Sequence, residues 1–170
     1  MVDYADRYDD FAQYAAAQGY YVVANDHLGH GASVVTDDQH GYFGHPNGNE
    51  CVIADIHTLR TMTQKKYPGK PYFMLGHSMG SFLIRQYMEM YGPGLSGVIV
   101  MGTGAQPGAA LFFGKLLCKV IAAFKGDDYR SAFVDNMAFG GYNKRFEPAR
   151  TDKDWLTRDE KVVDAYLANP

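Results

Sequence analysis

The stretch Gly76-His77-Ser78-Met79-Gly80 constrains this chain more than any other, because it has the pattern G-x-S-x-G and joins a strand-like segment to a helix-like one. Residues 71–75 before it form a short apolar run typical of a buried strand, and apolar residues recur at helical spacing over 82–90. A strand, a sharp turn and a helix in this order lift the serine hydroxyl above the end of a sheet. The pattern predicts that Ser78 is a nucleophile whose φ and ψ lie outside the helical and strand regions.

The same turn predicts a site for a developing negative charge. The helix after Ser78 directs its N-terminus, and the backbone N–H of Met79, toward the place where a tetrahedral oxyanion would form. Gly76 and Gly80 are expected to let the strand and helix backbones pack closely. The alternative interpretation is an inert serine on a glycine-bordered turn.

A serine nucleophile needs a general base, and after this kind of turn the partners follow in the order serine, aspartate or glutamate, histidine. No histidine follows Ser78 in the 170 residues. The six histidines are His27, His30, His40, His45, His57 and His77. The acid and the base of a triad are therefore absent from this chain. His27 and His30 are the only stand-ins expected at the correct end of the sheet, because they lie on a turn-rich loop that follows an apolar run.

Length and composition restrict the class of protein. A chain of 170 residues, 46% hydrophobic and 21% charged, is expected to be soluble and globular with a real core. The net charge of -3, with acids and bases interspersed, argues against nucleic-acid binding. Cys51 and Cys118 show neither disulfide nor metal spacing, which favours a reducing, cytoplasmic location. Neither a signal peptide nor a transmembrane segment is expected, since the first residues are acidic and residues 109–124 are too short to span a bilayer.

The order of elements predicts an α/β fold with a mostly parallel sheet flanked by helices. Strands are expected at residues 20–24, 72–76 and 97–101, parallel to one another because helical crossovers connect them. The expected helices are one near 8–16 that ends at Gly19, one near 50–66 with a core face running from Val52 to Met62, and one near 79–91.

Residues 1–104 are expected to form this core and residues 105–170 a helical cap, because the alternation with strands stops after Gly104. Such a segment is either a lid or a plain helical subdomain that packs on the sheet. The cap is expected to hold an amphipathic helix over 109–124 and an irregular aromatic segment over 127–147. A capping box over Thr157 to Glu160 predicts a short last helix.

No metal or cofactor site is predicted. His27 and His30, which lie three residues apart, complete no recognisable zinc pattern with His45 or His57. Asp55 and His57 face different sides of a predicted helix, so they are expected to be surface groups and not a catalytic pair.

Three motifs in combination resemble a known family. They are Arg7-Tyr8-Asp9-Asp10-Phe11 leading to Gly19-Tyr20, then Asn25-Asp26-His27-Leu28-Gly29-His30-Gly31, and then Gly76-His77-Ser78-Met79-Gly80. They look like the monoacylglycerol lipase and lysophospholipase group of α/β-hydrolases, which is serine aminopeptidase S33-like, and residues 154–159 look like the cap of these proteins. The resemblance covers nearly the whole chain. It implies a hydrolase of monoacylglycerol, lysophospholipid or short acyl esters, with Ser78 as nucleophile and the Met79 N–H as oxyanion donor.

The chain resembles the middle portion of such an enzyme. Family members have a His-Gly pair before the segment that matches residues 2–11, and a catalytic acid and histidine after the cap. The strands expected at 20–24, 72–76 and 97–101 match the family's fourth, fifth and sixth, and the third, which lies between the fourth and fifth, is absent. Three arrangements remain open: residues 20–24 pair directly with 72–75, a second copy or an exchanged strand fills the gap in a homo-oligomer, or the segment belongs to a larger assembly.

Two other functions are compatible with the sequence. The missing downstream histidine favours a catalytically incomplete fragment or pseudoenzyme whose apolar cap surface binds lipid or a partner chain. A peptidase or an acyltransferase would keep the fold and change the chemistry.

Overall fold

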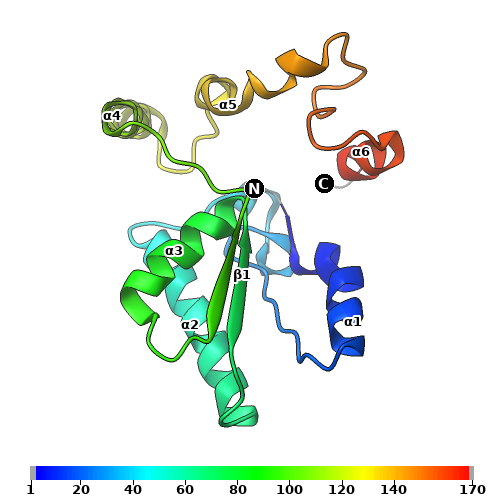
Figure 1. Cartoon of the computed structure of the whole chain (residues 1–170). Coiled ribbons are helices and arrows are strands. Elements are labelled where there is room, and N and C mark those ends of the chain that lie inside the picture. The colour runs from blue at the N-terminus through cyan, green and yellow to red at the C-terminus, as the bar shows by residue number, and fades with distance from the viewer. Residues whose placement is uncertain (1–2, 169–170) are drawn as a thin grey trace. The chain divides into compact units, whose positions relative to one another are not determined.

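The computed structural model describes residues 3–168, which divide into two compact units after Gly114. The first unit contains the helices α1 (Asp9–Ala17), α2 (Gly48–Lys66) and α3 (Met79–Tyr91) and the strands β1 (Phe73–His77) and β2 (Gly97–Met101) (Figure 1). The helix α4 (Gly108–Lys125) crosses the division, and the second unit adds α5 (Ala132–Phe139) and α6 (Glu160–Leu167). Short 3-10 turns are η1 (Ala5–Tyr8), η2 (Gly31–Ser33), η3 (Asp37–Gln39) and η4 (Tyr142–Phe146).

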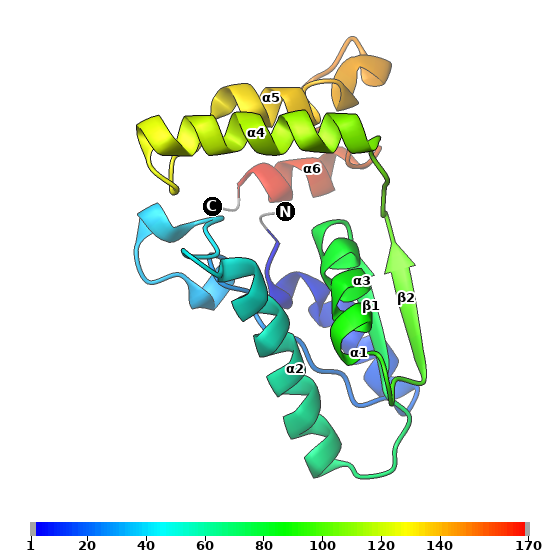
Figure 2. The same cartoon turned by 90° about the vertical axis from the view of Figure 1, so that its left-hand side faces the viewer.

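The sheet of the first unit consists of β1 and β2, which pair in parallel with Phe73 opposite Gly97 and His77 opposite Met101. Parallel strands need a crossover, and α3 supplies it. This helix packs against both strands, and α2 packs in turn against α3 (Figure 2). The α/β fold and the parallel pairing of these two strands are therefore confirmed.

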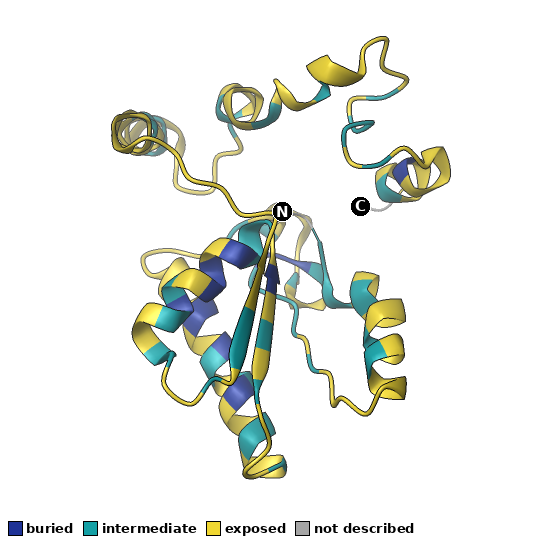
Figure 3. Cartoon of the chain, viewed as in Figure 1, coloured by how far each residue is buried: buried dark blue, intermediate teal, exposed yellow. Residues whose placement is uncertain are grey.

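The core of the first unit lies between α2 and α3. Its buried side chains are Val52, Ile53, Ile56, Leu83 and Tyr87, with Met74 of β1 packed against them. Figure 3 shows that most of the buried residues of the first unit lie on these two helices. The core ends before the last turns of α2, so the expectation for Met62 is wrong, because its side chain is 64% exposed.

Arg60 is buried on α2 just beyond this apolar core. Its Nη1 donates to the Tyr87 hydroxyl at 3.2 Å and to the Tyr91 carbonyl at 2.7 Å, and its Nη2 donates to the Pro93 carbonyl at 2.8 Å. A buried guanidinium is tolerated where hydrogen bonds replace its water. Arg60 thereby ties the C-terminal end of α3, and the loop that leads to β2, to α2.

The strand expected at residues 20–24 is absent, which is a correction to the sequence prediction. The segment carries no strand assignment, and β2 is the only partner of β1 among residues 3–168. Tyr21 instead receives a hydrogen bond from Lys66 at 3.1 Å and packs on the Tyr67 ring at a centroid distance of 4.4 Å. A ladder forms only when two backbones lie about 4.8 Å apart. A contracted sheet is therefore not formed, and one edge of β1 stays unpaired within the described chain.

The helix α1 forms as expected, and the turn after it includes Gly19 with φ +92°. It lies on the opposite side of β1 from α3 (Figures 1 and 2). No residue of α1 is buried, so this side of the sheet remains open within the described part of the first unit. Phe73, Leu75 and Ile99 are accordingly exposed.

The second unit is more helical than the sequence suggested. Residues 132–139 form α5 inside the segment expected to be irregular, and the Ser131 hydroxyl caps it by accepting the Val134 N–H at 3.3 Å. The helix expected over 109–124 is present as α4, but none of its residues is buried. Its apolar residues Phe112, Leu116 and Val120 are exposed.

The last helix is capped by a different residue from the one predicted. Asp159 is the N-cap of α6 and accepts the Lys161 N–H at 3.0 Å, whereas the Thr157 hydroxyl accepts the Asp159 N–H at 3.2 Å outside the helix. The capping box is therefore wrong. Aspartate ranks above threonine at an N-cap, which accounts for a start two residues later.

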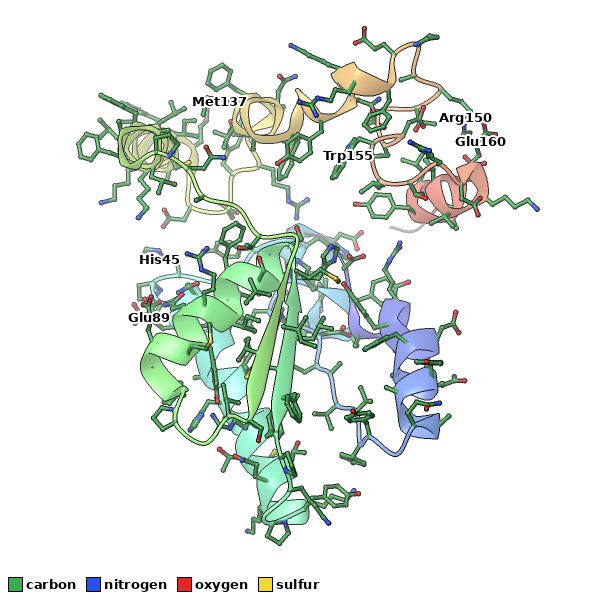
Figure 4. The ribbon with its side chains drawn as sticks, in the orientation of Figure 1. His45, Glu89, Met137, Arg150, Trp155 and Glu160 are labelled. Atoms are coloured by element: carbon green, nitrogen blue, oxygen red, sulfur yellow. The ribbon has the colours of Figure 1, made fainter. Side chains whose placement is uncertain are left out.

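Polar contacts join the residues before α6 to the helix itself. Arg150 forms an ion pair with Asp164 at 2.7 Å, and its Nη2 lies 3.4 Å from the Glu160 carbonyl. Figure 4 labels Arg150, Trp155 and Glu160 in this unit. The backbone N–H of Trp155 donates to the Asn143 side chain at 3.0 Å.

Within the described residues, no helix has the length and apolar character needed to cross a membrane.

Candidate active site

Ser78 lies between β1 and α3 in a strained backbone conformation. Its φ is 53° and its ψ is −116°, and it is the only residue other than glycine with a positive φ among residues 3–168. This confirms the conformation predicted from the motif. Such a backbone costs about 1–3 kcal/mol and persists only where its surroundings fix it.

Hydrogen bonds on both sides fix the Ser78 backbone. Its N–H donates to the Met101 carbonyl at 3.0 Å, which ties it to the end of β2. Its carbonyl accepts the Ser81 N–H at 2.9 Å and the Ser81 hydroxyl at 2.6 Å. The strained turn is therefore held by the neighbouring strand and by the first turn of α3.

The two glycines of the motif have different environments. A Cβ on Gly76 would collide with the Gly80 carbonyl oxygen and would lie 2.7 Å from both the Gly80 carbonyl carbon and the Ile84 Cδ1. The predicted close packing is confirmed there. A Cβ on Gly80 would meet no described atom within 4 Å beyond its chain neighbours and the backbone of its own helix, so the expected need for glycine is wrong for Gly80. The strand and helix backbones are in close contact between Gly76 and the Gly80 carbonyl, and only Gly76 must lack a side chain there.

The hydroxyl of Ser78 is not used to cap α3. Although Ser78 is the N-cap residue, its side chain makes no capping hydrogen bond within the described chain, and the residue is half-buried. Met79 is the first residue of α3, so no earlier turn of the helix offers a carbonyl to its N–H. The partial positive charge of the helix N-terminus adds to this donor. A nucleophilic hydroxyl and an anion-binding N–H thus belong to adjacent residues.

His77 is held by a residue far away in the sequence. The Tyr8 hydroxyl lies 3.1 Å from the His77 Nδ1. Burial raises the pKa of Tyr8 above its ordinary value, so the phenol stays protonated, and which group donates is set by the His77 tautomer. A Cβ on Gly102 would lie 3.2 Å from the His77 Cδ2. The ring therefore lies between η1 and the end of β2.

Asp26 organises the loop that contains His27 and His30. Its carboxylate accepts the Ala5 N–H at 2.7 Å and the Ala32 N–H at 2.8 Å. The loop is thereby joined to η1 near the start of the described chain.

The two loop histidines differ in their surroundings. The ring of His30 is buried, with its Nδ1 2.9 Å from the Leu28 carbonyl, to which it donates. The Nδ1 of His27 is buried and has no partner among residues 3–168. Burial, followed by the charge of His30, lowers the pKa of His27 below its ordinary value. No hydrogen bond joins either ring to Ser78 within the described chain, and the expectation that the chain alone lacks a working base stays a prediction.

His57 is not the surface group that the sequence predicted. Its Nδ1 lies 2.9 Å from the Tyr87 hydroxyl, and its ring stacks on Tyr91 at a centroid distance of 3.9 Å. Asp55 is exposed. Searched over residues 3–168, the structure brings no three His, Cys, Asp or Glu side chains together as a metal site.

A parallel pair of strands covered by helices, with a strained serine between strand and helix, defines an α/β protein with a nucleophile-elbow turn. The whole chain, residues 1–170, matches the family described as Hydrolase_4, serine aminopeptidase, S33. The chain belongs to this family.

Relatives of known name agree with this assignment. Human monoglyceride lipase is 28% identical over 178 residues, covering 99% of this chain and 48% of the relative. A monoacylglycerol lipase of Mycolicibacterium smegmatis is 28% identical over 173 residues, covering 99% and 52%. A thermostable carboxyl esterase from Bacillus coagulans, solved in complex with glycerol, superposes with a TM-score of 0.88 at 32% identity, covering 100% of this chain and 54% of the esterase. The chain spans about half the length of these relatives.

Sequence reasoning missed three contacts, one at the turn itself and two in the segments around it. Ser81 contacts the Ser78 carbonyl, Tyr8 contacts His77, and Asp26 joins the loop to η1. Ser81 directly follows the motif but lies on the other side of the predicted helix from the apolar residues at 82–90, so the periodicity left no signal for it. The contact between Tyr8 and His77 joins residues 69 positions apart and left no local signal.

Proposed function

We propose that this chain carries the nucleophilic centre of a serine esterase. The Ser78 hydroxyl attacks the carbonyl of an ester, the Met79 N–H donates to the resulting oxyanion, and the alcohol leaves as an acyl-enzyme forms on Ser78. Water then releases the acid and restores the serine. The observation that carries the proposal is the strained conformation of Ser78 between β1 and α3.

The proposed substrates are monoacylglycerol, lysophospholipid or short acyl esters. The names of the similar lipases and of the esterase support this class of substrate. The exposed apolar residues of α4 offer a surface suited to an acyl chain.

We also propose a cytoplasmic location, because Cys51 and Cys118 show neither disulfide nor metal spacing.

The base and the acid of the reaction are assigned to no residue of this chain. A serine hydroxyl without a base stays protonated at neutral pH, and in serine proteases the loss of the base lowers kcat by about 10⁴ to 10⁶. We therefore expect the purified chain to hydrolyse a p-nitrophenyl ester at a negligible rate and to show no rapid labelling by a fluorophosphonate. We expect turnover when a polypeptide covering the unmatched part of a related esterase is added.

The experiment compares the chain with Ser78→Ala and with Ser96→Ala, with and without the complementing polypeptide. Ser96 lies before β2, at the opposite end of the sheet from Ser78, and is a matched control. Turnover and labelling should be lost in Ser78→Ala alone. Failure of Ser78 to react in the complemented protein would contradict the proposal. Robust turnover by the chain alone would instead reveal a base within it, and loss of that turnover in His27→Ala or His30→Ala would identify it.

A second candidate function is a non-catalytic one, in which the chain binds lipid or a partner chain. It is favoured by the lack of buried residues on α4. Binding of the purified chain to phospholipid vesicles that is unaffected by Ser78→Ala, together with unreactive Ser78 after complementation, would support this candidate over the esterase.

A further inference from the structure

Ser81 is a fully buried hydroxyl directly after the elbow motif. It is 0% exposed and lies one turn before the buried Ile84, on another side of α3 from Leu83. The proposed reaction assigns it no part. Its Oγ donates to the Ser78 carbonyl at 2.6 Å. Serine side chains in helices often bond to a carbonyl one turn earlier, but here that carbonyl belongs to the strained residue.

The carbonyl of Ser78 and the N–H of Met79 are the two ends of one peptide group. Because a peptide group is planar, fixing the direction of the carbonyl also fixes the direction of the N–H. The carbonyl accepts two hydrogen bonds from Ser81, one from the backbone N–H at 2.9 Å and one from the hydroxyl. Hydrogen bonds that are linked through a peptide polarise one another, by about 10–30% per bond. The Met79 N–H is therefore both oriented and strengthened as a donor.

We propose that Ser81 is a positioning residue for the oxyanion site, acting through the peptide group between Ser78 and Met79. Its hydroxyl holds this peptide in place while the serine stays in its strained conformation. Ser81 does not touch the substrate. The inference rests on the proposed function of Ser78, and it adds a residue that controls how well the turn binds negative charge.

The first test is by NMR on the whole chain, with Ser81→Ala and Ser81→Cys. Alanine has nearly the size of serine and removes only the hydroxyl, while cysteine keeps a weaker donor. Thr58→Ala is the matched control, because the exposed Thr58 hydroxyl donates to the Ala54 carbonyl at 2.9 Å on α2, away from the turn. We expect Ser81→Ala to move the Ser78 carbonyl carbon and the Met79 amide proton upfield, Ser81→Cys to move them less, and Thr58→Ala to leave both unchanged.

The second test measures the slow rate at which a fluorophosphonate modifies Ser78, followed by intact mass over hours. We expect the rate constant to fall about 3- to 10-fold in Ser81→Ala, the range that corresponds to one neutral hydrogen bond, and less in Ser81→Cys. Unchanged Ser78 and Met79 resonances in Ser81→Ala would overturn the inference. So would shifted resonances with an unchanged rate constant. If Ser78 reacts neither in the unsubstituted chain nor in the complemented protein, the proposed function fails, and the resonance shifts still report whether Ser81 holds the peptide.

Discussion

Replacing Gly76 by alanine should destabilise the first unit, whereas the same change at Gly80 should not. A Cβ at position 76 would lie 2.7 Å from the Gly80 carbonyl carbon and from the Ile84 Cδ1, and it would collide with the Gly80 carbonyl oxygen. Two of these three atoms are backbone, so the strand and α3 must separate. Overpacking of this kind costs about 1–3 kcal/mol.

The loss of unfolded-chain entropy on replacing glycine by alanine offsets part of this cost, by about 0.4–1 kcal/mol. The net free energy of unfolding should therefore fall by up to about 2.6 kcal/mol in Gly76→Ala. Gly80→Ala provides the matched control, because its Cβ would meet nothing within 4 Å and the residue lies in the first turn of α3. Alanine there should stabilise the protein by about 0.5–1 kcal/mol.

Urea unfolding followed by far-UV circular dichroism is the suitable assay, because the single tryptophan, Trp155, lies in the second unit. The two variants should move the midpoint in opposite directions. A Gly76→Ala protein as stable as the unsubstituted chain, or as stable as Gly80→Ala, would refute the argument that close backbone contact at the elbow requires glycine.

Three further predictions concern other parts of the first unit. Arg60→Met should lower the free energy of unfolding by about 2–3 kcal/mol, because it removes charged hydrogen bonds from a buried guanidinium to the partly buried carbonyls of Tyr91 and Pro93. Exposed Lys65→Met should change it by less than about 0.5 kcal/mol, and equal effects in urea unfolding would contradict this. The pKa of His27 is lowered in the folded chain. As the pH falls below the usual value of 6.5, the His27 imidazole of the unfolded chain takes up a proton while that of the folded chain stays neutral. The stability present above that pH is therefore lost as the pH falls through the folded-state pKa. His27→Gln should flatten this loss in unfolding curves measured across the acidic range, and an unchanged pH profile would count against the buried neutral ring. The unpaired edge of β1 predicts self-association with a second copy; sedimentation velocity should show concentration-dependent dimers that Leu75→Lys reduces, and a monomer at every concentration would disprove it.

Much of the fold could be predicted from the sequence because its signals are local. The apolar spacing of residues 82–90, the glycine after α1 and the G-x-S-x-G pattern each depend on a few neighbouring residues, and the helices α1 to α4 and the strands β1 and β2 formed close to the expected bounds. The conformation of Ser78 was predictable for the same reason, since a strand that turns directly into a helix forces one residue into a strained region.

Errors arose where a distant partner decides the outcome. Residues 20–24 have the composition of a buried strand, yet a strand requires a neighbouring backbone, and none lies in reach among the described residues. Met62 fits the periodicity of the core face, but the apolar core of α2 ends at Ile56, and the next buried residue is Arg60, whose acceptors come from α3 and the loop after it. Helix periodicity specifies a face and does not specify what covers it.

The sequence by itself determined the elbow, its nucleophile candidate and the absence of any histidine after Ser78, because these depend on residue order alone. Only the tertiary structure showed that the Met101 carbonyl and the Ser81 hydroxyl hold the strained serine, and that Tyr8 holds His77. Hydrogen bonds of this kind depend on distances of about 3 Å between groups brought together by folding, and residue order does not specify such distances.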